Sequence, residues 1–139
     1  MITISNSKAD NHLKNVKSIL ERIQPLLFMD DWVFSIIEMP KDEDSTGDFG
    51  VMARISWQHS YKTANIIIYP ALRKLPPHEI AEALLHESFH AFLGKLTDMA
   101  NERFADKEEL ENATETIIEK LVRIMTWKLG VTLDKKAKR

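Results

Sequence analysis

The residues of this chain that most clearly predict chemistry are the five consecutive residues His86-Glu87-Ser88-Phe89-His90. Two histidines four residues apart in a helix lie on one face about one turn from each other, so both imidazoles can reach a single metal ion. Glu87 points about 100° away from His86, where its carboxylate can reach a water in the open coordination position of that metal. We therefore predict that His86 and His90 are metal ligands and that Glu87 is the general base.

The same five residues can also arise by chance on a helix that binds nothing. Their surroundings argue against chance, because the neighbouring residues are uncharged: Ala83, Leu84, Leu85, Ser88, Phe89, Ala91 and Phe92. Two histidines and a glutamate in so apolar a helix are costly to bury unless a metal or hydrogen-bonding partners compensate them. A metal site is therefore the favoured interpretation.

A third ligand has to come from elsewhere in the chain, because catalytic zinc sites usually have three protein ligands. The chain contains no cysteine and no histidine after His90, so a downstream carboxylate is the natural candidate. The last predicted helix offers four in one stripe: Glu108, Glu111, Glu115 and Glu119. Glu111 and Glu115 are nearest the apolar face of that helix, and the direction of Glu111 is slightly closer to its centre. The residues alone leave both open.

The other histidines have weaker claims to a site. His12 is expected on the polar side of the first helix, His59 in a loop and His78 at a helix start. Histidines in such positions are more often surface residues than site residues, so we assign no functional role to any of the three.

Hydrophobic periodicity predicts the elements that position these residues. A first helix is expected after Asp10, which can cap its first turn, and Pro25 should end or kink it. Its inward residues recur at helical spacing: Leu13, Val16, Leu20 and Ile23. Alternating apolar residues predict three strands, 32–39 with both faces buried, 51–57 and 64–69. The polar segment 40–48 is expected to be a hairpin connection at the surface.

Two further helices complete the predicted architecture. The first begins at Pro76 and Pro77, carries the histidines and ends at Gly94, where glycine suits a left-handed residue. The second follows Asp106, which can begin a capping box. Its expected inward residues are Ile117, Ile118, Leu121, Val122 and Met125. The basic tail at about 132–139 is expected to be a frayed end.

This arrangement resembles the gluzincin branch of the zinc metallopeptidases, in which a glutamate from the next helix completes a His-Glu-x-x-His helix. It is also similar to small zincin-like proteins encoded by phages and prophages, in which a strand like 64–69 precedes a segment like 75–90. Their last helix carries a glutamate followed by an apolar pair, as in Glu115-Thr-Ile-Ile-Glu-Lys-Leu121. The resemblance therefore implies Zn²⁺ as the metal and selects Glu115 as its third ligand. In thermolysin-like gluzincins an acid four residues beyond the glutamate ligand orients a histidine. Two pairs of acids in the last predicted helix have that spacing, Glu111 with Glu115 and Glu115 with Glu119.

The fold expected from the elements and the resemblance is α+β and zincin-like, in a single domain covering residues 1–139. It has an N-terminal helix, a sheet of three or four mostly antiparallel strands, the motif helix and a closing helix. The implied activity is hydrolysis of peptide bonds in short or unfolded substrates, with strand 64–69 bordering the cleft and pairing with an extended peptide. One alternative is a non-catalytic, zinc-stabilised binding or regulatory module on the same scaffold. Another is a structural or regulatory phage protein without metal.

Composition argues against several other partners. The 139 residues, 44% of them hydrophobic, suit one core, and the formal net charge of −2 gives no reason to expect binding to nucleic acid or to an anionic membrane. The longest apolar runs are far shorter than the roughly 20 residues of a membrane span. No secretory signal is expected from the first residues, and the absence of cysteine fits a reducing cytoplasm, that of the host if the protein is phage-encoded.

Overall fold

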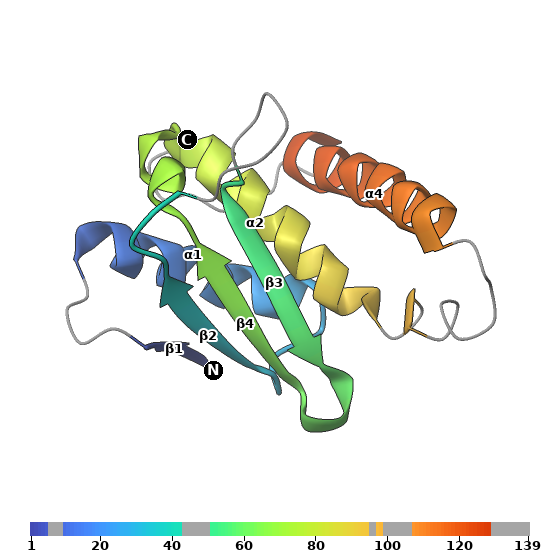
Figure 1. Ribbon diagram of the computed structural model, residues 1–139, viewed down its shortest axis with the longest axis horizontal. Coiled ribbons are helices and arrows are strands. Elements are labelled where there is room, and N and C mark those ends of the chain that lie inside the picture. The colour runs from blue at the N-terminus through green and yellow to red at the C-terminus, as the bar shows by residue number, and fades with distance from the viewer. Residues whose placement is uncertain (6–9, 43–50, 95–96, 99–106, 129–139) are drawn as a thin grey trace.

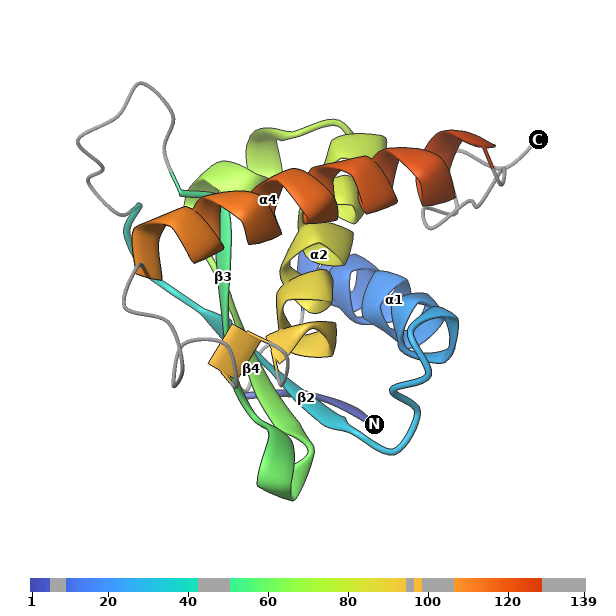
Figure 2. The same ribbon diagram turned by 90° about the vertical axis from the view of Figure 1, so that its right-hand side faces the viewer.

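The structure is a computed structural model that describes residues 1–5, 10–42, 51–94, 97–98 and 107–128. These residues form one four-stranded sheet and three α-helices, which confirms the predicted α+β class. The elements are β1 (Ile2–Ile4), α1 (Asn11–Leu26), β2 (Val33–Glu38), β3 (Ala53–Gln58), β4 (Thr63–Ile68), α2 (Pro77–Phe92) and α4 (Lys107–Arg123). Figures 1 and 2 show α1 and α2 on the same face of the sheet and α4 on the outer side of α2. No helix in the described ranges has the length and apolarity needed to cross a membrane.

The strands are arranged in the order β1-β2-β4-β3. β2 pairs in parallel with both β1 and β4, and only β3 runs antiparallel to its neighbour β4. The prediction of a mostly antiparallel sheet is therefore wrong. The predicted strands did not include the three-residue strand β1. α1 connects β1 to β2 as a helical crossover, and strands joined by such a crossover pair in parallel. Because β4 lies between β2 and β3, segment 40–48 does not join the strands of a hairpin, and its residues 43–50 lie outside the described part of the chain.

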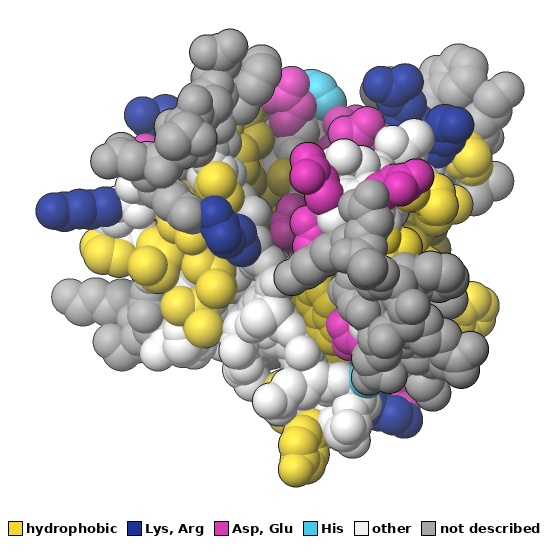
Figure 3. All heavy atoms as spheres, turned by 45° about the vertical axis from the view of Figure 1, so that its right-hand side comes forward, with side chains coloured by type: hydrophobic (Ala, Val, Ile, Leu, Met, Phe, Trp, Pro, Cys, Tyr) yellow, Lys and Arg dark blue, Asp and Glu magenta, His cyan; other side chains and the backbone are white. Residues whose placement is uncertain are grey.

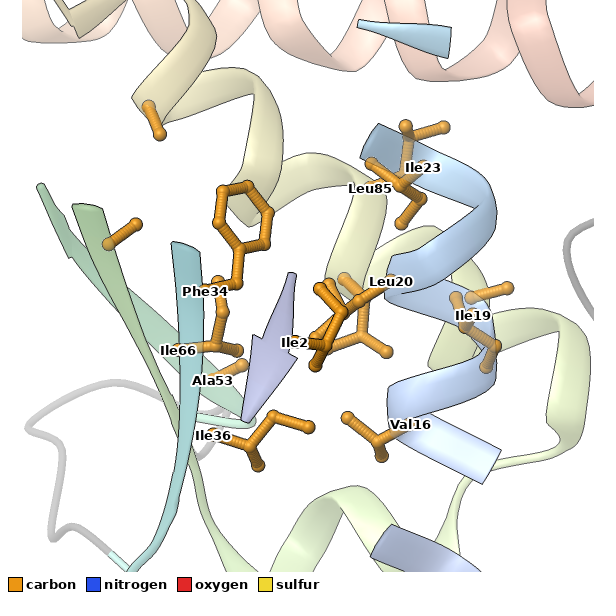
Figure 4. Close-up of a cluster of buried hydrophobic side chains, with 14 of the residues drawn as sticks. Ile2, Val16, Ile19, Leu20, Ile23, Phe34, Ile36, Ala53, Ile66 and Leu85 are labelled. Carbon is orange, nitrogen blue, oxygen red and sulfur yellow. The ribbon is translucent and has the colours of Figure 1, made fainter. Parts of the chain in front are cut away.

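Only one face of the sheet is buried. Phe34 and Ile36 of β2 are fully buried. Figure 4 shows both side chains on the face of the sheet that the helices cover. Val33 and Ile37 on the opposite face of β2 are partly exposed. The expectation of a strand buried on both sides is wrong, because α1 and α2 both cover the same face and no described element covers the other.

α1 begins and ends close to the predicted positions. A carboxylate oxygen of Asp10 accepts a hydrogen bond from the backbone N–H of Leu13 at 2.9 Å, and this bond holds the pKa of Asp10 below its usual value. Pro25 lies in the last turn, the helix ends at Leu26, and the chain then adopts a positive φ of 56° at Phe28. α1 buries all four predicted residues, Leu13, Val16, Leu20 and Ile23, and also buries Ile19 and Gln24.

α2 begins at Pro77, as predicted, but Gly94 does not have the predicted role. The helix is capped by Leu93 in right-handed conformation (φ −89°, ψ −2°). A Cβ atom at Gly94 would lie 2.3 Å from the indole Nε1 of Trp57 and 3.0 Å from Nε2 of His59. Glycine is therefore required here because the backbone approaches these two rings closely, and no left-handed turn is involved.

α4 packs on the rest of the protein mainly through Ile118 and Val122, which are buried. Ile117 is 52% exposed, so its predicted inward position is wrong, because consecutive residues of a helix point about 100° apart. Leu121 and Met125 pack against the core in part, as predicted. The capping residue proposed at 106 and the basic tail at 132–139 lie outside the described residues.

Candidate metal centre

Packing of the apolar side of α2 sets the direction of its two histidines. Ile80, Leu84 and Leu85 are buried in the core that α2 shares with the sheet and α1. His86 and His90 therefore project from the other side, toward α4, and keep 25% and 21% of their side-chain surface exposed. Their ring centroids lie 5.1 Å apart with an interplanar angle of 63°. This is the two-imidazole arrangement that the four-residue spacing predicts.

Glu115 of α4 contacts both imidazoles. Its Oε2 lies 3.0 Å from Nε2 of His86, and its Oε1 lies 2.6 Å from Nε2 of His90. Within the described residues, these three form the one group of His, Cys, Asp or Glu side chains whose ligand atoms all lie within 4.8 Å of one another. Of the two leading candidates for the third position, the structure therefore brings Glu115 to the histidines.

The other acids of the stripe on α4 lie around this cluster and are exposed. Glu111 lines a pocket together with His90 and Glu115. Glu119 lines a different pocket together with His86 and Glu87. Glu115 therefore lies between two other acids of the stripe, Glu111 one turn before it and Glu119 one turn after it.

Glu87 lies beside the cluster, outside the candidate ligand set. Its Oε2 is 4.0 Å from Nε2 of His86, and its side chain is only 18% exposed. Burial, reinforced by the negative charge of Glu115, raises the pKa of Glu87 to about 7, while Arg54 opposes this rise. A divalent cation held by the cluster would lower this pKa again, because positive charge favours the carboxylate.

Burial also affects His90, whose pKa is lowered chiefly by desolvation of the charged imidazolium, with a smaller contribution from His86. Glu115 acts in the opposite direction. Desolvation thus favours the neutral imidazole, which is the form that binds metal ions.

Two pockets flank the cluster. The first has a volume of about 410 Å³ and includes His86 and Glu87 in its wall, together with Val51–Ala53 at the start of β3. The second, of about 460 Å³, includes His90 and Glu115 together with Trp57 near the end of β3. Since both pockets contain residues of β3 or its first neighbours, they follow this strand on either side of the histidines.

The strand beside this cleft is β3. Strand 64–69 was expected to border the cleft and to pair with an extended peptide, but it corresponds to β4, which is hydrogen-bonded to β2 on one side and to β3 on the other. β4 therefore has no edge for another strand, and that prediction is wrong. β3 pairs with β4 alone among the described strands and is therefore an edge strand. Residues from both ends of β3 line the pockets that flank the candidate centre.

The remaining histidines differ in part from the prediction. His78 is exposed, as expected. His12 is only partly exposed and His59 lies against the ring of Trp32, with centroids 5.0 Å apart. In both residues Nε2 is buried and has no hydrogen-bond partner among the described residues. These two histidines are therefore more buried than typical surface histidines, and none of the three belongs to the cluster that the described residues of α2 and α4 form.

Sequence reasoning did not identify Arg54 and Trp57 as neighbours of the site. Arg54 lowers the pKa of Glu87, and Trp57 lines the pocket beside His90. Alternation placed both residues on a strand, but no sequence signal indicates that this strand would lie at the edge next to α2. Arg123 of α4 lines the pocket that contains His86 and Glu87, whereas Tyr61 is 76% exposed on the β3–β4 turn.

Comparison of the chain with protein-family models, with curated proteins and with solved structures found no match. The function proposed below therefore depends on the chemistry and geometry of these residues.

Proposed function

We propose that this chain is a zinc-dependent peptidase whose Zn²⁺ is held by His86, His90 and Glu115, with Glu87 as the general base. The observation that carries the proposal is the convergence of Glu115 on both imidazoles, with Glu87 adjacent but outside the set of ligands. Three protein ligands and one open position are typical of catalytic zinc, whereas structural zinc sites usually use four protein ligands.

The donor set suits zinc. Two imidazole nitrogens and one carboxylate oxygen are its usual ligands in the absence of cysteine, at bond lengths of about 2.0–2.2 Å. Tetrahedral geometry at those lengths separates neighbouring ligand atoms by about 3.3 Å. The contacts of Glu115 with His90 and His86, at 2.6 and 3.0 Å, would have to lengthen by about 0.7 and 0.3 Å to reach that separation. Zn²⁺ held here would polarise a peptide carbonyl and lower the pKa of a bound water to about 7.

In this proposal Glu87 moves the proton. Its carboxylate would accept a proton from the attacking water and would then deliver it to the nitrogen of the departing amine. The side chain is well suited to this role because it is largely buried and its Oε2 lies 4.0 Å from the nearest ligand atom of His86. Glu87 thus lies beside the three proposed ligands, where its carboxylate can reach a group bound between them.

Peptides are the favoured substrates because of the edge of β3. An extended peptide can add to an exposed edge strand by main-chain hydrogen bonds, which fix its direction without requiring a particular sequence. β3 presents such an edge along the two pockets that flank the cluster. A short or unfolded segment laid along β3 would pass the histidines with side chains directed to either pocket.

The proposal is tested by metal analysis followed by peptide cleavage. Protein purified without added zinc should contain one zinc ion per chain, and it should cleave members of a broad peptide library. Zinc without cleavage would favour the alternative of a zinc-stabilised binding module. A chain that takes up no zinc, even when refolded in its presence, would refute both readings.

A further inference from the structure

The pocket beside Glu87 has an acidic wall. Glu79 and Glu82 from the first half of α2 and Glu119 from α4 line it, and all three side chains are exposed. Among the described residues that line this pocket, Arg123 is the one lysine or arginine. Figure 3 shows acidic side chains gathered around a hollow in the surface beside α4.

None of the three carboxylates forms an ion pair with another residue in the part of the chain that the structure describes. Arg123 can balance one negative charge at most, so the wall keeps a negative excess toward any group that enters the pocket. A cation there would gain electrostatic attraction, whereas an acidic side chain would be repelled.

The position of the pocket connects this charge to the reaction. His86 and Glu87 belong to the same wall, so a substrate group held in the pocket lies next to the bond that is cleaved. We propose, on the basis of the peptidase function above, that this pocket selects substrates with a cationic group beside the scissile bond. That group is either the side chain of lysine or arginine or a free amino terminus, because all of them present N–H donors with positive charge.

The expected selectivity follows from Coulomb's law. Two unit charges about 4 Å apart in a water-like environment attract strongly enough to change an equilibrium constant roughly fivefold. Removing two of the three carboxylates should therefore reduce the preference for a cation by about an order of magnitude or more. The exposed position of these acids also means that the preference should weaken as salt is added.

The test measures binding, so that it does not depend on turnover. The probes are alanine hexapeptides, acetylated and amidated, that carry either lysine or norleucine at one position, and a neutral hexapeptide with either a free or an acetylated amino terminus. Calorimetry on the zinc-loaded Glu87→Gln variant should show tighter binding of the lysine peptide or of the free amino terminus, and these two comparisons identify which source of charge the pocket takes. Adding Glu79→Gln and Glu82→Gln should reduce that preference, and Glu82→Lys should reverse it.

Glu108→Gln is the matched control, because it removes one exposed acid from α4 that does not line the pocket. Equal binding of lysine and norleucine peptides and of both amino termini would overturn the inference, as would a preference that survives loss of Glu79 and Glu82. Binding of none of the probes would overturn it as well. The proposed function can fail separately: a cation preference in binding without cleavage of any peptide by the wild type leaves the pocket assignment and refutes the peptidase.

Discussion

Replacing Glu115 by alanine should weaken zinc binding far more than the same change at Glu111. Glu115 contacts His86 and His90 at 3.0 and 2.6 Å, whereas Glu111 lies one turn earlier on α4 and lines the pocket beside them. Both changes remove one exposed or half-exposed carboxylate from the same helix. The comparison therefore separates loss of a ligand from loss of a nearby charge.

The magnitude can be worked out from this geometry. Zinc sites in small peptides bind with about 10–16 kcal/mol, so each of four coordination positions contributes roughly 3 kcal/mol. That corresponds to about a hundredfold loss of affinity. Glu115 is 45% exposed, so water can enter the vacated position and the loss should not greatly exceed this value. Glu111, about 6 Å further along the helix axis, can act only through its charge, and its removal should change affinity by a few-fold.

Zinc affinity is best measured by competition with a chelator of known affinity, with circular dichroism to verify that each variant is folded. His90→Ala is the reference variant, because it removes one of the two histidines that Glu115 contacts. A larger effect at Glu111 than at Glu115 would refute the assignment of the third ligand. Unchanged zinc affinity in all three variants would refute the proposed metal site.

Three other predictions concern the proposed base, the tight contact of α2 and the cap of α1. Glu87→Gln should keep zinc and fold while peptide hydrolysis falls by about 10²–10⁴-fold, and turnover near the wild-type rate in the zinc-loaded variant would show that Glu87 is not the base. Gly94→Ala should lower the free energy of unfolding by about 1–3 kcal/mol in urea titrations, because its Cβ would lie 2.3 Å from Nε1 of Trp57; a stabilised variant would contradict this close approach. Asp10→Ala should lower the urea midpoint at neutral pH. The pKa of Asp10 is lowered in the folded state, so the stability that Asp10 contributes is present above the unfolded pKa and is lost as the pH falls through the folded pKa. The two midpoints should therefore converge at acidic pH, and a constant gap would argue against the Leu13 hydrogen bond as the source of that stability.

The helices could be predicted from sequence because their signals are local. Asp10 caps α1 and Pro77 begins α2, each within a few residues of the feature that identifies it. The direction of the strands could not be predicted in this way, because parallel pairing of β1 with β2 depends on contacts about thirty residues apart, such as Ile2 with Phe34. A three-residue strand has too little periodicity to be recognised in a sequence. Without β1 in the prediction, α1 could not be identified as a crossover between two parallel strands.

The candidate site could be predicted to the extent that it lies on one helix. The spacing of His86, Glu87 and His90 fixes their relative directions, and the structure places them accordingly. The neighbours contributed by β3 could not be predicted, because alternation shows which residues share a face of a strand but not which strand forms the edge. Arg54 and Trp57 were therefore identified only from the arrangement of β3 beside α2.

The third ligand shows how the two kinds of information combine. Ile118 and Val122 face the core, which fixes the rotation of α4, and Glu111 and Glu115 differ by only about 40° around that helix. Periodicity therefore admits both acids. They differ by about 6 Å along the helix axis, and no pattern within α4 determines how far the helix slides along α2. Because both histidines contact the same carboxylate, the axial position places Glu115 level with the pair, and its acidic neighbours on either side can only line the adjoining pockets.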